Sequence, residues 1–130
     1  MNMKTKIVIL ALSVFVIGTA YAGRRSTYVT TVDTANRTAY GDVMSARSSA
    51  GANAFIGCTV LGFSSGSSEA ICSAGDASGV TAYCYSQAPA IIQAASVSGS
   101  STYYYFQWDA SSQCTYVYAS NESVYGPLQP

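Results

Sequence analysis

The sequence predicts an α+β protein that is mainly β: an antiparallel meander sheet of about five strands with one short helix, held by two disulfides. Two observations predict this class. After residue 53, short runs rich in β-branched and aromatic residues alternate with clusters of Gly, Ser and Asp at a spacing of roughly ten residues. All four cysteines also lie after residue 53, and such cysteines indicate disulfides in an exported chain.

The first 22 residues have the pattern of a signal peptide. Lys4 and Lys6 precede an apolar run over residues 7–18, and Ala20-Tyr21-Ala22 is the small-x-small pattern that signal peptidase recognises. The run is shorter than the roughly 20 apolar residues that a transmembrane helix needs. We therefore expect cleavage after Ala22, no stable membrane insertion afterwards, and a secreted or periplasmic protein.

The chain after the signal peptide divides into two parts. Residues 23–52 form a polar, weakly patterned N-terminal segment, in which residues 43–47 suit either a turn of helix or a strand. Residues 53–130 form the disulfide-bonded, β-rich domain. The strands expected there cover residues 55–63, 69–74, 80–85, 102–108 and 113–119.

Turns and a helix connect these strands. Asp-Ala-Ser-Gly at 76–79 and Asp-Ala-Ser-Ser at 109–112 are typical of tight hairpin loops, with Gly79 at a position of positive φ. Residues 89–97 predict a short helix that starts at Pro89 and ends before Gly99. Ala88 has no capping side chain, so Ser86 or water must accept from the first amides of the helix.

The turns also predict which cysteines meet. They place the hairpin axes at residues 65 and 78, so Cys58, Cys72 and Cys84 form one row across three strands. A bridge between the outer two spans about 9.5 Å, whereas a disulfide needs its Cα atoms within about 7 Å. Two pairings remain: Cys58–Cys72 with Cys84–Cys114, which we prefer, or Cys72–Cys84 with Cys58–Cys114.

The last hairpin carries an aromatic run. Its expected register places one set of residues on the core face: Tyr104, Phe106, Trp108, Cys114, Tyr116 and Tyr118. The opposite face carries Tyr103, Tyr105, Gln107, Thr115 and Val117. We expect Tyr103, Tyr105 and Gln107 to be candidate binding residues, because exposed tyrosines stack on sugar rings or pack against partner proteins.

The aromatic run is also uncharged from 99 to 107 and free of proline, so self-association through an open edge is an alternative.

The composition argues against most chemistry. The chain has no histidine and no CxxC motif, which removes the usual triads, most metal sites and redox exchange, so we expect no enzyme, no metal and no cofactor. Asp76 and Asp109 open turns, where aspartate is common for local hydrogen bonds. After residue 22, four arginines oppose six carboxylates, a net side-chain charge of −2, which argues against nucleic acid as a partner.

Short motifs surround the cysteines and turns: Ser45-Ala46-Arg47-Ser48, Phe55-Ile56-Gly57-Cys58, Cys72-Ser73-Ala74, Asp76-Ala77-Ser78-Gly79, Cys84, Phe106 with Trp108-Asp109, and Cys114-Thr115. Together they resemble a group of small secreted four-cysteine proteins from proteobacteria, over residues 39–125. The resemblance implies export and the cysteine framework, and no activity. The chain departs from that group at Ala88-Pro89, where an aspartate before the proline is usual.

These observations predict a non-catalytic, exported binding or interaction protein whose partner is an unknown protein or glycan. One alternative is a structural subunit of an extracellular or surface assembly. A second is a small inhibitor of a secreted enzyme, which needs a protruding loop, and residues 62–68 are the candidate.

Overall fold

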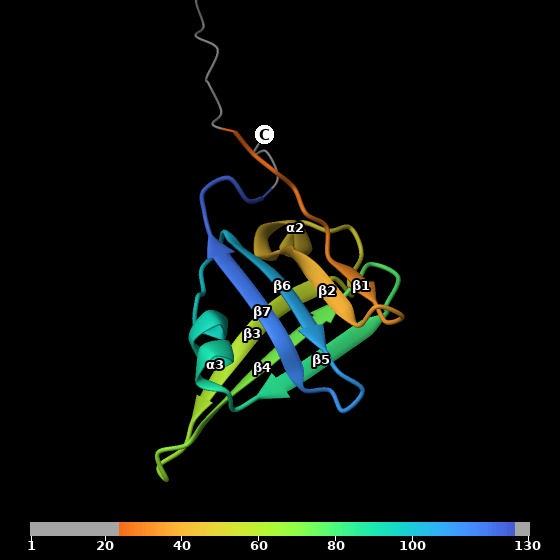
Figure 1. Ribbon diagram of the computed structural model, residues 1–130. Helices are drawn as coiled ribbons and strands as arrows, with labels where there is room; N and C mark the ends of the chain where they lie inside the picture. The colour runs from red at the N-terminus through yellow and green to blue at the C-terminus, as the bar shows by residue number, and fades with distance from the viewer. Residues whose placement is uncertain (1–23, 127–130) are drawn as a thin grey trace, which may run out of the picture.

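The structure, a computed structural model, describes residues 24–126, and the predicted signal peptide lies outside them. Seven strands form two antiparallel sheets, ordered β1-β2-β6-β7 and β3-β4-β5 (Figure 1). The strands are β1 (Thr31–Asp33), β2 (Thr38–Asp42), β3 (Phe55–Gly62), β4 (Ser68–Gly75), β5 (Thr81–Ser86), β6 (Thr102–Trp108) and β7 (Cys114–Asn121). The helices are α2 (Val43–Arg47) and α3 (Pro89–Ala95). The mainly β fold with two disulfides is therefore confirmed.

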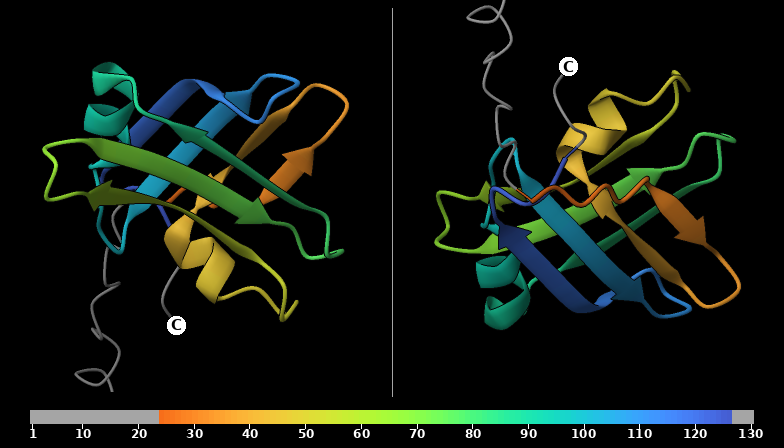
Figure 2. Two further views of the ribbon diagram at one scale, coloured as in Figure 1. Left: turned by 90° about the horizontal axis from the view of Figure 1, so that it is seen from below. Right: turned by 90° about the horizontal axis from the view of Figure 1, so that it is seen from above.

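The strands form two sheets instead of one continuous meander. Residues 87–101, which include α3, carry the chain from β5 to the second sheet, where β6 pairs with β2 and β7. The two sheets lie face to face with their strands crossing, and each helix contacts both sheets (Figure 2). Neither helix has the length and apolar character that crossing a membrane requires.

Small residues fill most of the space between the sheets. Phe106 is the largest side chain that is completely buried. The rest of the buried apolar core is Ala39, Ala46, Ile56, Ala70, Cys72, Ala74, Cys84, Ala95, Tyr104, Cys114 and Val117. A core of such small side chains brings the two sheets close together, and crosslinks add to the limited area that a domain of this size buries.

The predicted register of the three-stranded sheet is confirmed. Cys58 pairs with Cys72, and Cys72 pairs with Cys84, so the three lie in one row. The Asp76 turn sets the second pairing: the Asp76 Oδ1 atom accepts from the amides of Ser78 and Val80, both at 3.0 Å, and Gly79 has a φ of 90°. The hydrogen bond from the Ser78 hydroxyl is the largest cause that lowers the pKa of Asp76, which keeps this carboxylate charged.

The preferred disulfide pairing is confirmed as well. Cys58–Cys72 joins β3 to β4 within one sheet. Cys84–Cys114 joins β5 to β7 and thereby links the two sheets. The second link is strengthened nearby, where the amide of Tyr85 donates to the carbonyl oxygen of Ser112 at 3.0 Å.

The boundary expected at residue 52 does not separate two structural units. β2 lies between β1 and β6, and its Ala39 is fully buried in the common core. The inward positions of β2 are Ala39 and Gly41, so the strand has no large apolar residue on its inward side. A Cβ atom at Gly41 would lie 2.8 Å from the Cα atom of Thr30, so only glycine fits there.

Both helices begin in the way that their sequences require. Residues 43–47 form the helical alternative, α2, and the buried carboxylate of Asp42 caps it by accepting from the Ser45 amide at 2.6 Å. α3 has Pro89 in its first turn and no side-chain cap at Ala88. Ser86 serves this end, as expected, because its hydroxyl accepts from the Ala88 amide at 3.1 Å.

Candidate functional site

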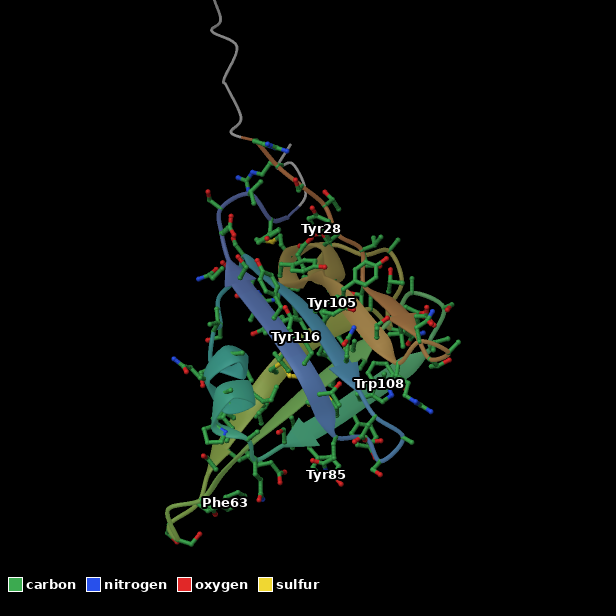
Figure 3. All side chains as sticks on the ribbon, in the orientation of Figure 1. Tyr28, Phe63, Tyr85, Tyr105, Trp108 and Tyr116 are labelled. Atoms are coloured by element: carbon green, nitrogen blue, oxygen red, sulfur yellow. A yellow bond between two sulfur atoms is a disulfide. The ribbon has the colours of Figure 1, made fainter. Side chains whose placement is uncertain are left out.

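The outer side of the four-stranded sheet gathers most of the tyrosines of the chain. We call this surface the tyrosine face; its members are Tyr28, Tyr40, Tyr103, Tyr105, Tyr116, Tyr118 and Tyr125. Figure 3 shows Tyr28, Tyr105 and Tyr116 on the side of this sheet that faces the viewer. Residues from the N-terminal segment, β2, β6, β7 and the C-terminal end of the described chain therefore meet on one surface.

The central strand of this surface is β6. Along it, buried and half-buried residues alternate: Thr102, Tyr104 and Phe106 point into the core, and the residues between them point outward. Tyr103 and Tyr105 lie on the outer face, as predicted, with Gln107 on the same side. Their role in binding stays a prediction.

Strand β7 differs from the expected register, and this changes the surface. Trp108 pairs with Cys114 as predicted, but Gln107 pairs with Tyr116, because Thr115 is an extra residue in a β-bulge. The prediction that Tyr116 and Tyr118 face the core is therefore wrong. Val117 is buried in their place, and both tyrosines join the outer face.

Tyr103 is the centre of one group of rings on this face. Its ring centroid lies 5.0 Å from that of Tyr28, 5.3 Å from that of Tyr125 and 6.1 Å from that of Tyr118. Burial by these neighbours, followed by the charges of the neighbouring phenolates, raises the pKa of Tyr103 to about 12. The segment that carries Tyr28 is held by the amide of that residue, which donates to the Oδ2 atom of Asp42 at 2.8 Å.

Tyr105 is the centre of a second group. Its ring stacks on Tyr40 with centroids 6.5 Å apart and meets the edge of Tyr116 at 5.9 Å. The Nε2 atom of Gln107 donates to the phenol oxygen of Tyr105 at 2.6 Å. Tyr105 and Gln107 thus act as one hydrogen-bonded unit, and the two groups continue into each other along β6 and β7.

Exposure separates the rings that support the surface from those that a ligand can contact. Tyr28, Tyr116 and Tyr118 are 41%, 48% and 43% exposed, whereas Tyr103 and Tyr105 are half-buried between their neighbours. The three exposed rings are therefore accessible to a ligand. Tyr103 and Tyr105, which the sequence predicts as candidate binding residues, pack against them.

The tyrosine face is polar but carries few charges. The outward positions of β6 and β7 have phenols, hydroxyls and one amide, and none of them is charged: Tyr103, Tyr105, Gln107, Thr115, Tyr116, Tyr118 and Ser120. The surface therefore offers flat rings with hydroxyl groups around them. Within residues 24–126, no three acidic or cysteine side chains come together as a metal site.

Three members of this surface, besides the misassigned pair, were not predicted from the sequence. Tyr28 and Tyr40 lie in the segment that appeared weakly patterned, and Tyr125 lies beyond the last expected strand. The alternation in Thr38-Ala39-Tyr40-Gly41 is the available signal for Tyr40, because small residues on one side and a ring on the other fit a half-buried strand. No local signal places Tyr28 or Tyr125 beside Tyr103.

Comparisons of the chain with protein-family models, with curated proteins and with solved structures find no match. The resemblance to secreted four-cysteine proteins of proteobacteria stays a prediction.

Proposed function

We propose that this chain is an exported, non-catalytic protein that binds a neutral glycan on its tyrosine face. The observation that carries the proposal is the array of seven tyrosines on one sheet surface, with three of them well exposed. Two disulfides support the exported location, because disulfides persist in oxidising compartments.

The chemistry of the surface favours a glycan over an apolar partner. Every ring on the face is a tyrosine, so each apolar ring carries a hydroxyl at its outer end. A sugar presents the same combination, an apolar C–H face ringed by hydroxyls. The absence of charge at the outward positions of β6 and β7 favours a neutral glycan over an acidic one.

The test is binding to immobilised neutral polysaccharides, namely dextran, mannan and galactan, measured with the purified protein from residue 23 onward. We expect at least one to be bound. The double substitution Tyr116→Ala with Tyr118→Ala should weaken binding by at least about fivefold, because each stacked ring contributes about 0.5–1.5 kcal/mol. Tyr85→Ala is the matched control, since it removes an exposed tyrosine from the other sheet and should leave binding unchanged.

Equal binding by the double variant and the control would contradict the proposal, as would no binding to any of the three polysaccharides. Circular dichroism of each variant checks that its fold is unchanged.

A second candidate function follows from the β3–β4 hairpin, which extends beyond the rest of the molecule (Figures 1 and 2). Leu61 and Phe63 are 38% and 49% exposed on it, so the hairpin presents apolar side chains at its tip. Such a hairpin suits insertion into a cleft of another protein, as in inhibitors of secreted enzymes. Replacing residues 62–68 by a two-residue turn should abolish that inhibition and leave glycan binding unchanged.

A further inference from the structure

A small pocket lies at the end of the molecule where the turn between β1 and β2 meets the turn between β6 and β7. It has a volume of about 200 Å³ and six lining residues: Thr34, Thr81, Ala82, Tyr83, Trp108 and Ser112. The pocket therefore takes residues from both sheets. Figure 3 shows Trp108 near this end, on the opposite side of Tyr105 from Tyr28.

The lining has the chemistry of a neutral sugar site. Trp108 and Tyr83 supply two aromatic rings, and Thr34, Thr81 and Ser112 supply three hydroxyls that both donate and accept hydrogen bonds. None of the six residues is charged. Tyr83 is 60% exposed, so its ring is free to contact a ligand.

The size of the pocket suits a small ligand of one ring. Sites for drug-sized molecules have volumes of about 300–1,000 Å³, and this pocket is smaller. A larger hollow of about 430 Å³ lies between the tip of the β3–β4 hairpin and α3, but no aromatic ring lines it. Stacking is therefore available in the smaller pocket and not in the larger one.

One wall of the pocket, at Ser112, is held in place before any ligand binds. The Ser112 amide donates to the Asp109 carbonyl oxygen at 3.1 Å, and the Ser112 carbonyl accepts from Tyr85 at 3.0 Å. The Cys84–Cys114 disulfide ties the strand that carries Tyr83 to the strand that follows Ser112. A rigid site loses little conformational entropy when a ligand binds.

We infer that this pocket is a subsite for a single uncharged pyranose ring, stacked on Trp108 and Tyr83 and hydrogen-bonded by the surrounding hydroxyls. The inference rests on the proposed function, because it assigns a neutral glycan as the ligand. It adds a second contact site on the molecule, separate from the tyrosine face.

Trp108 is the sole tryptophan of the chain, so its fluorescence reports directly on the pocket. The experiment titrates the protein with the methyl glycosides of glucose, galactose, mannose and N-acetylglucosamine. We expect a saturable change in emission with at least one of them. Tyr83→Ala and Thr81→Val, which change exposed residues and keep Trp108, should each weaken that affinity about three- to tenfold.

Tyr85→Ala is again the control, because Tyr85 lies on the same strand and its side chain does not line the pocket. The variant keeps the backbone amide that donates to Ser112, so it should leave the titration unchanged. The inference would be overturned if no glycoside gave a saturable change. It would also be overturned if the Tyr83 and Thr81 variants bound the glycoside with the affinity of the parent protein.

The two proposals fail separately. Polysaccharide binding that depends on Tyr116 and Tyr118, with no response from Trp108, would overturn the pocket and support the tyrosine face. A response from Trp108 that depends on Tyr83, with polysaccharide binding unaffected by the Tyr116 and Tyr118 substitutions, would support the pocket and contradict the tyrosine face.

Discussion

Tyr103 organises the tyrosine face at the scale of single residues. Three other rings, those of Tyr28, Tyr118 and Tyr125, pack around it within 6.1 Å. A phenol in this position loses contact with water and has other phenols beside it. Both effects disfavour its anionic form, which is why its pKa rises to about 12.

The raised pKa predicts how stability depends on pH. The unfolded chain ionises a tyrosine near pH 10, whereas folded Tyr103 ionises near 12. Its contribution to stability is therefore complete below about pH 10 and is lost as the pH rises from about 10 to about 12. Chemical denaturation across that range should show a falling free energy of unfolding. The Tyr103→Phe substitution should make this fall smaller.

Absorbance of tyrosinate supplies the control for this prediction. Tyr103→Phe should remove the ionisation step near pH 12, whereas Tyr118→Phe, a substitution on the same face, should retain it. A Tyr103→Phe variant that keeps the step would show that another residue is responsible.

Thr102 is a second residue with a measurable consequence. Its side chain is completely buried, and its Oγ1 atom has no hydrogen-bond partner among the described residues. A buried hydroxyl without a partner costs about 1–3 kcal/mol. Thr102→Val keeps the shape and removes the hydroxyl, so we expect it to raise the free energy of unfolding by about 1 kcal/mol.

Thr102→Ser is the matched variant, because it keeps the hydroxyl and removes the methyl group; it should lower the free energy of unfolding by about 1 kcal/mol. Urea denaturation measures both. A Thr102→Val protein that is less stable than the parent would mean that the hydroxyl is satisfied.

At the scale of elements, the β-bulge in β7 decides which side chains form the surface. Cys114 and Val117 both face the core although they are three positions apart, which is compatible with one extra residue between them. Thr115 and Tyr116 consequently both point outward. Without the bulge, β7 would alternate regularly after Cys114, as the sequence alone predicts.

Two deletions test this role. Deleting Thr115 removes the extra residue and leaves Cys114, Tyr116 and Val117 on their present faces. We therefore expect a folded protein whose free energy of unfolding falls by less than about 2 kcal/mol. Deleting Val117 turns Tyr118 inward and should cost more than about 4 kcal/mol. Guanidinium denaturation compares them, and equal losses would contradict the assigned bulge.

The elements also show how far sequence reasoning reaches. Strands β3, β4 and β5 and their register were predictable, because the glycine- and serine-rich turn at 62–68 and the Asp76 turn fix the two hairpins locally. That register reduced the cysteine pairings to two, of which the preferred one is present. β2 was not, because its inward residues are Ala39 and Gly41 and their fit depends on distant partners. The bulge in β7 was not predictable either, since no residue type marks its position. The tyrosine face therefore emerges only when β2, β6, β7 and both ends of the described chain are assembled.

At the scale of the whole molecule, two sheets with a small-residue core depend on covalent links. Cys58–Cys72 closes a short loop within one sheet, with a sequence separation of 14. Cys84–Cys114 has a separation of 30 and joins the sheets. It therefore restricts the unfolded chain more and also holds one wall of the Trp108 pocket.

We expect the two disulfides to contribute unequally. Replacing Cys84 and Cys114 by alanine should lower the free energy of unfolding by about 0.6 kcal/mol more than replacing Cys58 and Cys72, from loop closure alone. The loss of the link between the sheets should widen that gap. Denaturation of the two double variants measures both free energies of unfolding. A larger decrease for the variant without Cys58 and Cys72 would contradict the assigned roles.

The most direct test of the binding surface is a map of ligand-induced chemical shifts by nuclear magnetic resonance, recorded on the protein from residue 23 onward. The ligand is an oligosaccharide of the neutral polysaccharide that binds best. The proposed function predicts that the largest shifts fall on the tyrosine face, at Tyr28, Tyr116, Tyr118 and their neighbours. Largest shifts at the tip of the β3–β4 hairpin, or no shifts with any neutral glycan, would contradict it.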